Sequence, residues 1–226
     1  SICQRIFNYG EKKMLIDMYE GVSYEKKILD VYREYFMSLV NVTKVVRPRK
    51  VLYIAIDGAA PLAKQNQQRQ RRFGRISSSE FDSSNITPGT RFMHDLTIFI
   101  KESIPYAIDG DMCPTNSFQK LISGTWEGIE VIFSPPTVAG EGEHKLMEYT
   151  RSLPETEKID ASHCFFGPDG DLIMLGLTSA LPKVHLLRQD IFRNGGYKYI
   201  DIGCGFSSTV SKLFGLKTHT SLQHTK

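Results

Sequence analysis

The sequence predicts an α/β fold, with a largely parallel sheet flanked by helices and a carboxylate cluster at the C-terminal ends of the strands. Short apolar segments typical of buried strands alternate with segments of helical periodicity along most of the 226 residues. Acidic residues come directly after three of the predicted strands. Because parallel strands are joined by right-handed crossovers, their carboxyl ends share one edge of the sheet, where α/β proteins bind ligands.

The first predicted elements are a helix, a strand and a second helix. An amphipathic helix covers about residues 24–39, with apolar residues at helical spacing. The apolar run 51–57 (VLYIAID) then forms a short strand that ends in Asp-Gly. Pro61 suits a first helical turn, and a polar helix is predicted from there to about Phe73.

The next predicted helix has clear signals at both ends. Thr87 is the expected N-cap, and Pro88 lies in the first turn. Pro105 is expected to end the helix, since the residue before a proline avoids helical geometry. The apolar face of this helix comprises Phe92, Leu96, Phe99 and Ile100.

The second half of the chain continues the alternation of strands and helices. A strand over 129–133 leads through Pro-Pro to a helix over about 141–151. A strand over 163–167 leads to a helix that begins near Asp171. Two further strands are predicted over 184–187 and 197–202.

Composition limits the classes of protein that fit. With 41% hydrophobic and 23% charged residues and no long apolar run, the chain predicts a globular domain without a membrane span. Residues 1–20 show no signal peptide, and the four cysteines form no C-x-x-C pair, which indicates reduced thiols in an intracellular protein, whether of cytoplasm or nucleus. The net charge of +3 does not by itself identify a nucleic-acid partner. Since the chain starts at Ser1, we expect a truncated or processed N-terminus.

Five carboxylates are candidates for a metal and catalytic site. Like charges gathered at one sheet edge repel one another, so such a cluster requires cations. Oxygen ligands favour Mg²⁺ or Mn²⁺, and a pair of these ions can activate water for phosphodiester cleavage. The plainer interpretations are an Asp-Gly turn, as expected at 109–111, and acidic residues that complement a helix N-terminus. The candidates are Asp57, Glu141, Glu143, Asp169 and Asp171.

A basic helix follows the first of these carboxylates. The segment 64–75 (KQNQQRQRRFGR) has five positive charges and no negative one. Counted from Lys64, spacings of four, seven and eight residues place a glutamine and two arginines on the same helical face as the lysine. These cationic and amide donors suit the oxygens of a terminal phosphate. A solvated basic face is the alternative. The residues of this predicted 5′-phosphate pocket are Lys64, Gln68, Arg71 and Arg72.

Several long strings together resemble the XRN-type 5′→3′ exoribonucleases, over roughly residues 1–200. They occur in the family's order, and they are IDGAAPLAKQNQQRQRRF (56–73), ITPGTRFM (86–93), the stretch 126–134 followed by GEGEHKLMEY (140–149), and DGDLIMLGL (169–177). The resemblance implies metal-dependent, processive removal of nucleotides from single-stranded RNA with a 5′-monophosphate. The family's metal ligands and phosphate pocket fall on the two residue sets named above.

The chain also departs from the family pattern. Residues 1–3 look like the continuation of an Asp-x-Asn motif whose aspartate is missing, and Gln4 stands where the family has a base-stacking histidine. The later Gly-Asn-Asp motif is absent, so we expect an incomplete nuclease domain over 1–200 and a divergent tail over 201–226. Within the tail region, 199–208 (YIDIGCGFSS) resembles a methyltransferase glycine motif, but too few residues follow for that domain.

Two other functions stay open at this point. A catalytically incomplete chain would bind 5′-phosphorylated RNA through the basic helix without cleaving it. A DNA nuclease of the flap-endonuclease type shares the carboxylates at strand ends, although that family lacks the KQNQQRQRR string. The choice of RNA depends on the resemblance, since no residue is identified as a reader of the 2′-hydroxyl.

Overall fold

The structure, a computed structural model, describes residues 24–66, 85–167, 169–179, 181–189 and 196–203. The chain divides into two compact units, a first unit over Ser1–Leu146 and a second unit over Met147–Lys226. Each unit contains one small sheet. Within the described ranges, no helix has both the length and the apolar character needed to cross a membrane.

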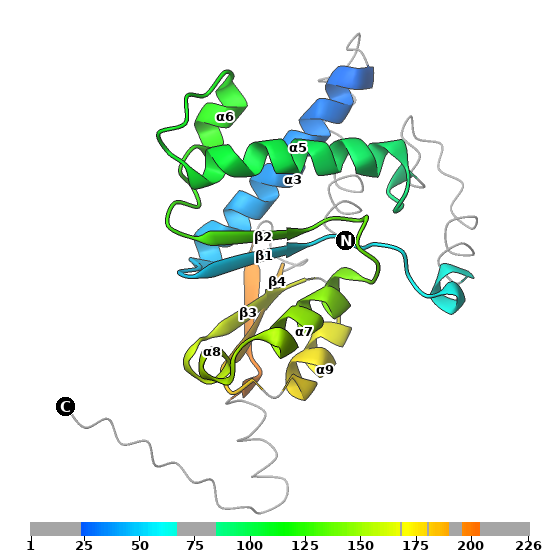
Figure 1. Cartoon of the computed structure of the whole chain (residues 1–226), viewed down its shortest axis with the longest axis vertical. Coiled ribbons are helices and arrows are strands. Elements are labelled where there is room, and N and C mark those ends of the chain that lie inside the picture. The colour runs from blue at the N-terminus through cyan, green and yellow to red at the C-terminus, as the bar shows by residue number, and fades with distance from the viewer. Residues whose placement is uncertain (1–23, 67–84, 168, 180, 190–195, 204–226) are drawn as a thin grey trace, which may run out of the picture. The chain divides into compact units, whose positions relative to one another are not determined.

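In the first unit, two strands that are distant in sequence pair in parallel. Strand β1 (Val51–Ala55) lies beside β2 (Glu130–Ser134), with Val51 opposite Glu130 and Ala55 opposite Ser134. Helix α3 (Tyr24–Val46) precedes β1, and α5 (Arg91–Ile108) and α6 (Ser117–Ile122) lie between the strands in sequence. Helix α5 packs against α3, α6 and β2, as Figure 1 shows. Both strands and the parallel crossover agree with the prediction.

An aromatic core fills the space between these helices. Helix α3 directs Tyr32, Phe36 and Val40, four residues apart, to one buried face. The Phe36 ring centroid lies 5.1 Å from that of Trp126 and 5.9 Å from that of Phe118. Trp126 is fully buried. Since both strands are anchored to this core, the loops at their carboxyl ends extend from a rigid base.

Helix α5 begins and ends later than predicted, so both of its predicted end signals are wrong. Its N-cap is Thr90, whose hydroxyl oxygen accepts a hydrogen bond from the Met93 amide, while residues 87–89 form a turn with Gly89 at φ +90°. Pro105 lies inside the last turn, and the helix continues to Ile108. A proline there removes one hydrogen bond, and the complete burial of Ala107 against the core explains why the turn persists.

In the second unit, three strands form a mixed sheet. Strand β3 (His163–Phe166) pairs in parallel with β4 (Val184–Gln189), and β4 pairs antiparallel with β5 (Tyr197–Asp201). Helix α9 (Asp171–Thr178) connects β3 to β4 and packs on β4. The close packing depends on Gly176, where a Cβ would lie 2.9 Å from Ile202 Cδ1.

A single, largely parallel sheet is therefore not confirmed, although the α/β class is. The described strands form two separate ladders, and β5 runs antiparallel. Only residues 190–196 separate β4 from β5, which is too short for a parallel crossover.

Three further helices complete the described chain. Helix α7 (Gly142–Ser152) follows the loop after β2, and α8 (Glu155–Asp160) precedes β3. Helices α6 and α8 were not predicted, because six residues give too little periodicity to recognise. The basic helix is described only over residues 62–66, so the rest of its predicted span lies outside the described residues.

Candidate metal centre

The carboxylate of Asp57 is fixed at the N-terminus of α7. Strand β1 ends at Ala55, and Ile56 continues the ladder through its amide, which donates to the Ser134 carbonyl at 3.1 Å. Asp57 then accepts a hydrogen bond at Oδ1 from the Gly142 amide, at 2.7 Å. The amides at a helix N-terminus carry partial positive charge, so this contact orients the carboxylate and stabilises its charge.

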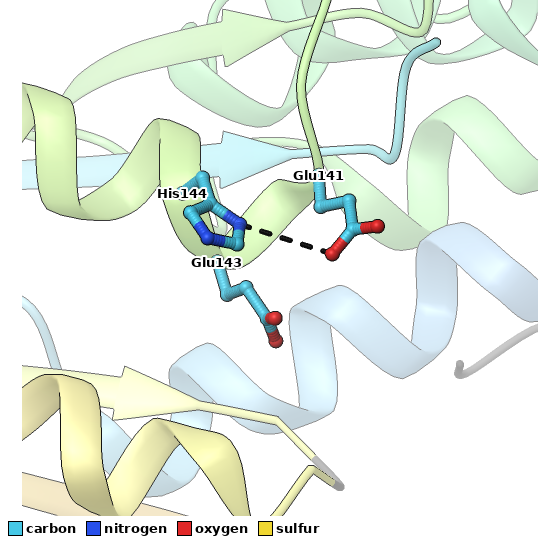
Figure 2. A group of neighbouring side chains, drawn as sticks. All are labelled: Glu141, Glu143 and His144. Atoms are coloured by element: carbon cyan, nitrogen blue, oxygen red, sulfur yellow. Dashed lines mark ion pairs between the residues drawn. The ribbon is translucent and has the colours of Figure 1, made fainter. Parts of the chain in front are cut away.

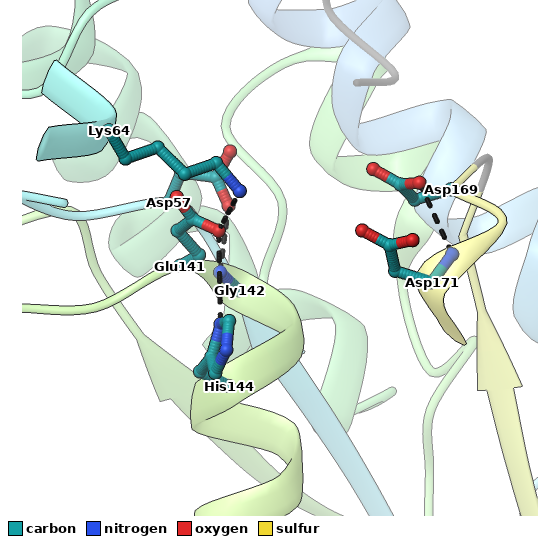
Figure 3. Close-up of polar contacts among 7 residues, drawn as sticks. All are labelled: Asp57, Lys64, Glu141, Gly142, His144, Asp169 and Asp171. Carbon is teal, nitrogen blue, oxygen red and sulfur yellow. Dashed lines mark hydrogen bonds and ion pairs between the residues drawn. The ribbon is translucent and has the colours of Figure 1, made fainter. Parts of the chain in front are cut away.

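Two loops approach closely to make this contact possible. The Gly58 amide donates to the Gly140 carbonyl at 2.8 Å, and the Gly140 amide donates to the Ala59 carbonyl at 3.0 Å. A Cβ at Gly58 would lie 1.9 Å from the Val138 carbonyl oxygen, and Gly140 has φ +101°. Only glycine suits either position. The loop after β1 and the loop after β2 are thus held together by their backbones. This places Glu141 beside Asp57, although the two residues are far apart in the sequence (Figure 3).

Glu141 is the most deeply buried carboxylate of the group. It is 7% exposed, and its Oε2 lies 2.6 Å from the Lys64 ammonium and 3.8 Å from His144 Nδ1. Among the described residues, the buried Oε1 has no hydrogen-bond partner. A buried carboxylate oxygen without a donor is costly, and a bound cation is one way to offset that cost.

Glu141, Glu143 and His144 bring three ligand atoms together. One donor atom from each lies within 4.8 Å of the others, and Figure 2 shows all three side chains at the start of α7. Glu143 is partly buried and His144 is exposed. Two carboxylates fit Mg²⁺ or Mn²⁺, and one of them, Glu141, has a buried oxygen with no hydrogen-bond partner in the described part of the chain. Sequence reasoning missed His144, which the three-residue helical spacing from Glu141 could have revealed.

Lys145 is a second residue that the sequence analysis did not select. It is 3% exposed, and its ammonium donates to the Ile56 carbonyl at 2.7 Å and to the Pro135 carbonyl at 3.0 Å. Burial lowers the pKa of Lys145, and the negative charge of Asp57 opposes that shift. The buried ammonium of Lys145 thus lies at the ends of the two parallel strands, near Asp57.

Asp169 and Asp171 lie in the second unit, after β3 and at the start of α9. Both are exposed, and the Asp171 amide donates to Asp169 Oδ1 at 3.3 Å (Figure 3). This places the pair at the carboxyl end of a strand, as the sequence predicted, and its metal role stays a prediction.

The predicted phosphate pocket is described only at Lys64. In this structure the Lys64 ammonium contacts Glu141, a residue 77 positions away. The other three predicted residues, Gln68, Arg71 and Arg72, lie outside the described residues.

Fold and site together define an α/β protein with a carboxylate cluster that could hold a metal ion. The family profile described as XRN 5′-3′ exonuclease N-terminus matches residues 6–80 and 75–190. The 5′-3′ exoribonuclease 1 of Homo sapiens is 37% identical over 188 residues, which is 74% of this chain and 10% of the human protein. The Saccharomyces cerevisiae 5′-3′ exoribonuclease 1 is 35% identical over 182 residues, covering 72% of this chain and 11% of the yeast protein.

A Candida albicans 5′-3′ exoribonuclease 2 is also similar, at 34% identity over 201 residues, which cover 75% of this chain and 20% of that protein. The chain thus belongs to the XRN 5′-3′ exonuclease family and corresponds to its N-terminal region. It spans between 10% and 20% of the length of these three relatives.

Proposed function

We propose that the chain is part of a 5′→3′ exoribonuclease that hydrolyses RNA bearing a 5′-monophosphate, with divalent metal ions as cofactors. The observation that carries the proposal is the buried Oε1 of Glu141, which no described residue partners, beside Glu143 and Asp57 in a chain of the XRN family. The relatives named above are 5′-3′ exoribonucleases, which supports the same reaction for this chain. We place the nuclease domain at residues 1–200 and treat 201–226 as outside it.

The carboxylates that the sequence singles out would hold the metal. When bound, a pair of Mg²⁺ or Mn²⁺ ions supplies activated water and neutralises charge on the scissile phosphate. Glu141 contributes an oxygen that has no partner among the described residues, and the Gly142 amide holds Asp57 in one orientation. The proposed metal and catalytic residues are Asp57, Glu141, Glu143, Asp169 and Asp171.

The basic helix would hold the 5′-phosphate of single-stranded RNA. Its described start supports this role, because Lys64 lies 2.6 Å from Glu141 and therefore at the edge of the carboxylate cluster. A phosphate bound by Lys64 would lie near the proposed metal ligands, as removal of a terminal nucleotide requires. Gln68, Arg71 and Arg72 would complete the pocket on the same helical face.

A cleavage assay with matched substrates tests the proposal. Three RNAs of one sequence with 5′-monophosphate, 5′-hydroxyl and 5′-triphosphate ends are incubated with the chain in Mg²⁺ or in EDTA. We expect Mg²⁺-dependent release of mononucleotides from the monophosphate RNA alone. Glu141→Gln should reduce the rate at least about 100-fold, beyond the loss typical of an outer-shell partner. Glu148→Gln, a change of the same kind at an exposed position of α7, should not reduce it.

The end-group controls separate the alternatives. Selective binding of the monophosphate RNA without cleavage would indicate a non-catalytic binder, with the basic helix intact. Arg71→Ala/Arg72→Ala should abolish the preference for the monophosphate in either case. Equal cleavage of all three RNAs by folded protein would refute the phosphate pocket.

A further inference from the structure

Lys145 is a charged residue at a position where burial normally excludes one. It lies one helical turn after Glu141, and its amide donates to the Glu141 carbonyl at 3.0 Å. Only 3% of its surface is exposed. An ammonium group is stable at such a site only when its hydrogen bonds and its charge are compensated.

The partners of Lys145 are the residues that follow the two parallel strands. Its ammonium donates to the carbonyls of Ile56 and Pro135, which come directly after β1 and β2. Ile56 is also the residue before Asp57. One side chain on α7 therefore ties together the two strand ends from which the loops of the metal centre begin.

Asp57 is thus held to α7 at two points. The Gly142 amide contacts its carboxylate, and Lys145 contacts the carbonyl of the residue before it.

We infer that Lys145 is a positioning residue that holds Asp57 in the orientation in which its carboxylate serves the metal centre. The inference rests on the metal-dependent function proposed above. Lys145 itself touches neither metal nor substrate in this scheme. The positive charge of Lys145 by itself repels a cation, so removing only this charge would raise the metal affinity. Loss of the positioning of Asp57 would lower the metal affinity. The sign of the change therefore separates the two roles.

Direct metal binding to the whole chain tests the inference, with free Mn²⁺ followed by electron paramagnetic resonance. Lys145→Met keeps the length of the side chain and removes its charge and donors. We expect about 10-fold weaker Mn²⁺ binding, as for other residues that orient a metal ligand. In an Asp57→Asn background the same substitution should have no further effect, because Lys145 acts through Asp57. Lys101→Met, at an exposed site on α5, is the matched control and should bind Mn²⁺ like the wild type.

Hydrogen exchange without metal gives a second readout. The Gly58 amide, which donates to Gly140 at 2.8 Å, should exchange faster in Lys145→Met, while amides of α5 keep their wild-type rates. A purely structural lysine would change both sets of amides together. If Lys145→Met does not fold, Lys145→Gln replaces it, since its amide can still donate to one of the two carbonyls.

The outcomes are distinguishable from failure of the proposed function. Unchanged or tighter Mn²⁺ binding by a folded Lys145 variant, or an equal effect in the Asp57→Asn background, overturns the inference and leaves the proposed function standing. A wild-type chain that binds no Mn²⁺ overturns both.

Discussion

Replacement of Gly58 by alanine tests how tightly the two loops of the candidate metal centre are joined. The added Cβ would lie 1.9 Å from the Val138 carbonyl oxygen and 3.0 Å from that of Pro136. Both neighbours are backbone atoms, which cannot rotate away as a side chain would. The loop after β2 must therefore move by about 1 Å, since overpacking at a rigid site is relieved only by a backbone shift.

The cost follows from the contacts that such a shift breaks. The Gly58–Gly140 and Gly140–Ala59 backbone hydrogen bonds, of 2.8 Å and 3.0 Å, join the two loops directly. Each contributes about 1 kcal/mol net, and overpacking adds roughly 1–3 kcal/mol. We expect Gly58→Ala to lower the free energy of unfolding by about 2–4 kcal/mol, less than the full sum of about 3–5 kcal/mol because the loop can partly relax.

Urea denaturation followed by tryptophan fluorescence measures this loss. Trp126 is the single tryptophan and is fully buried in the first unit, so its emission reports on that unit. For a typical urea dependence, the expected loss lowers the midpoint by about 1–2 M. Gly110→Ala is the control, because a Cβ there would be no closer than 3.6 Å to any neighbour. If the two variants unfold at the same urea concentration, the close approach of the loops is not as the structure has it.

Three further predictions concern single contacts. Thr43→Val leaves the buried indole N–H of Trp126 without its 2.8 Å partner and should cost about 1–3 kcal/mol in urea denaturation, whereas Thr178→Val, at an exposed site, should cost little. Gly142→Ala places a Cβ 3.2 Å from Asp57 Oδ1, so Mn²⁺ affinity measured by paramagnetic resonance should fall roughly 3- to 10-fold. The free energy of unfolding should change by less than about 0.5 kcal/mol, and a larger loss of stability would contradict this prediction. Burial lowers the pKa of His163 below 6.5, so the unfolded chain binds this proton more readily; stability should fall as pH drops through the region below 6.5, and His163→Gln should show a smaller fall in pH-dependent urea titrations.

Local sequence signals predicted most of the elements that position the site. The apolar runs that contain Val51 and Val184 are strands, and the helix predicted from the GEGEHK string (140–145) begins at Gly142, one residue from its predicted start. These predictions succeeded because strand and helix periodicities are set by side-chain spacing within a few residues. The prediction of one parallel sheet needed more than local spacing, since strand pairing depends on the length and path of each connection.

The ends of α5 show how local signals fail. Thr87 and Thr90 both precede an apolar helical run, and the sequence alone favours the one followed by proline. The structure uses Thr90, because Gly89 takes a left-handed turn before it. Burial of Ala107 likewise decides that the helix continues past Pro105.

The sequence by itself determined the family, the order of the strands and of the helices longer than six residues in the described ranges, and the acidic and basic residues available for catalysis. Only the tertiary structure showed that Lys64 contacts Glu141, that Lys145 is buried beneath Asp57 and that His144 joins the carboxylates. The physical reason is that burial and ion pairing depend on residues brought together from distant parts of the chain. From sequence alone, a lysine on a helix is expected to be exposed to solvent. Lys145 is instead buried, because α7 packs against the ends of β1 and β2.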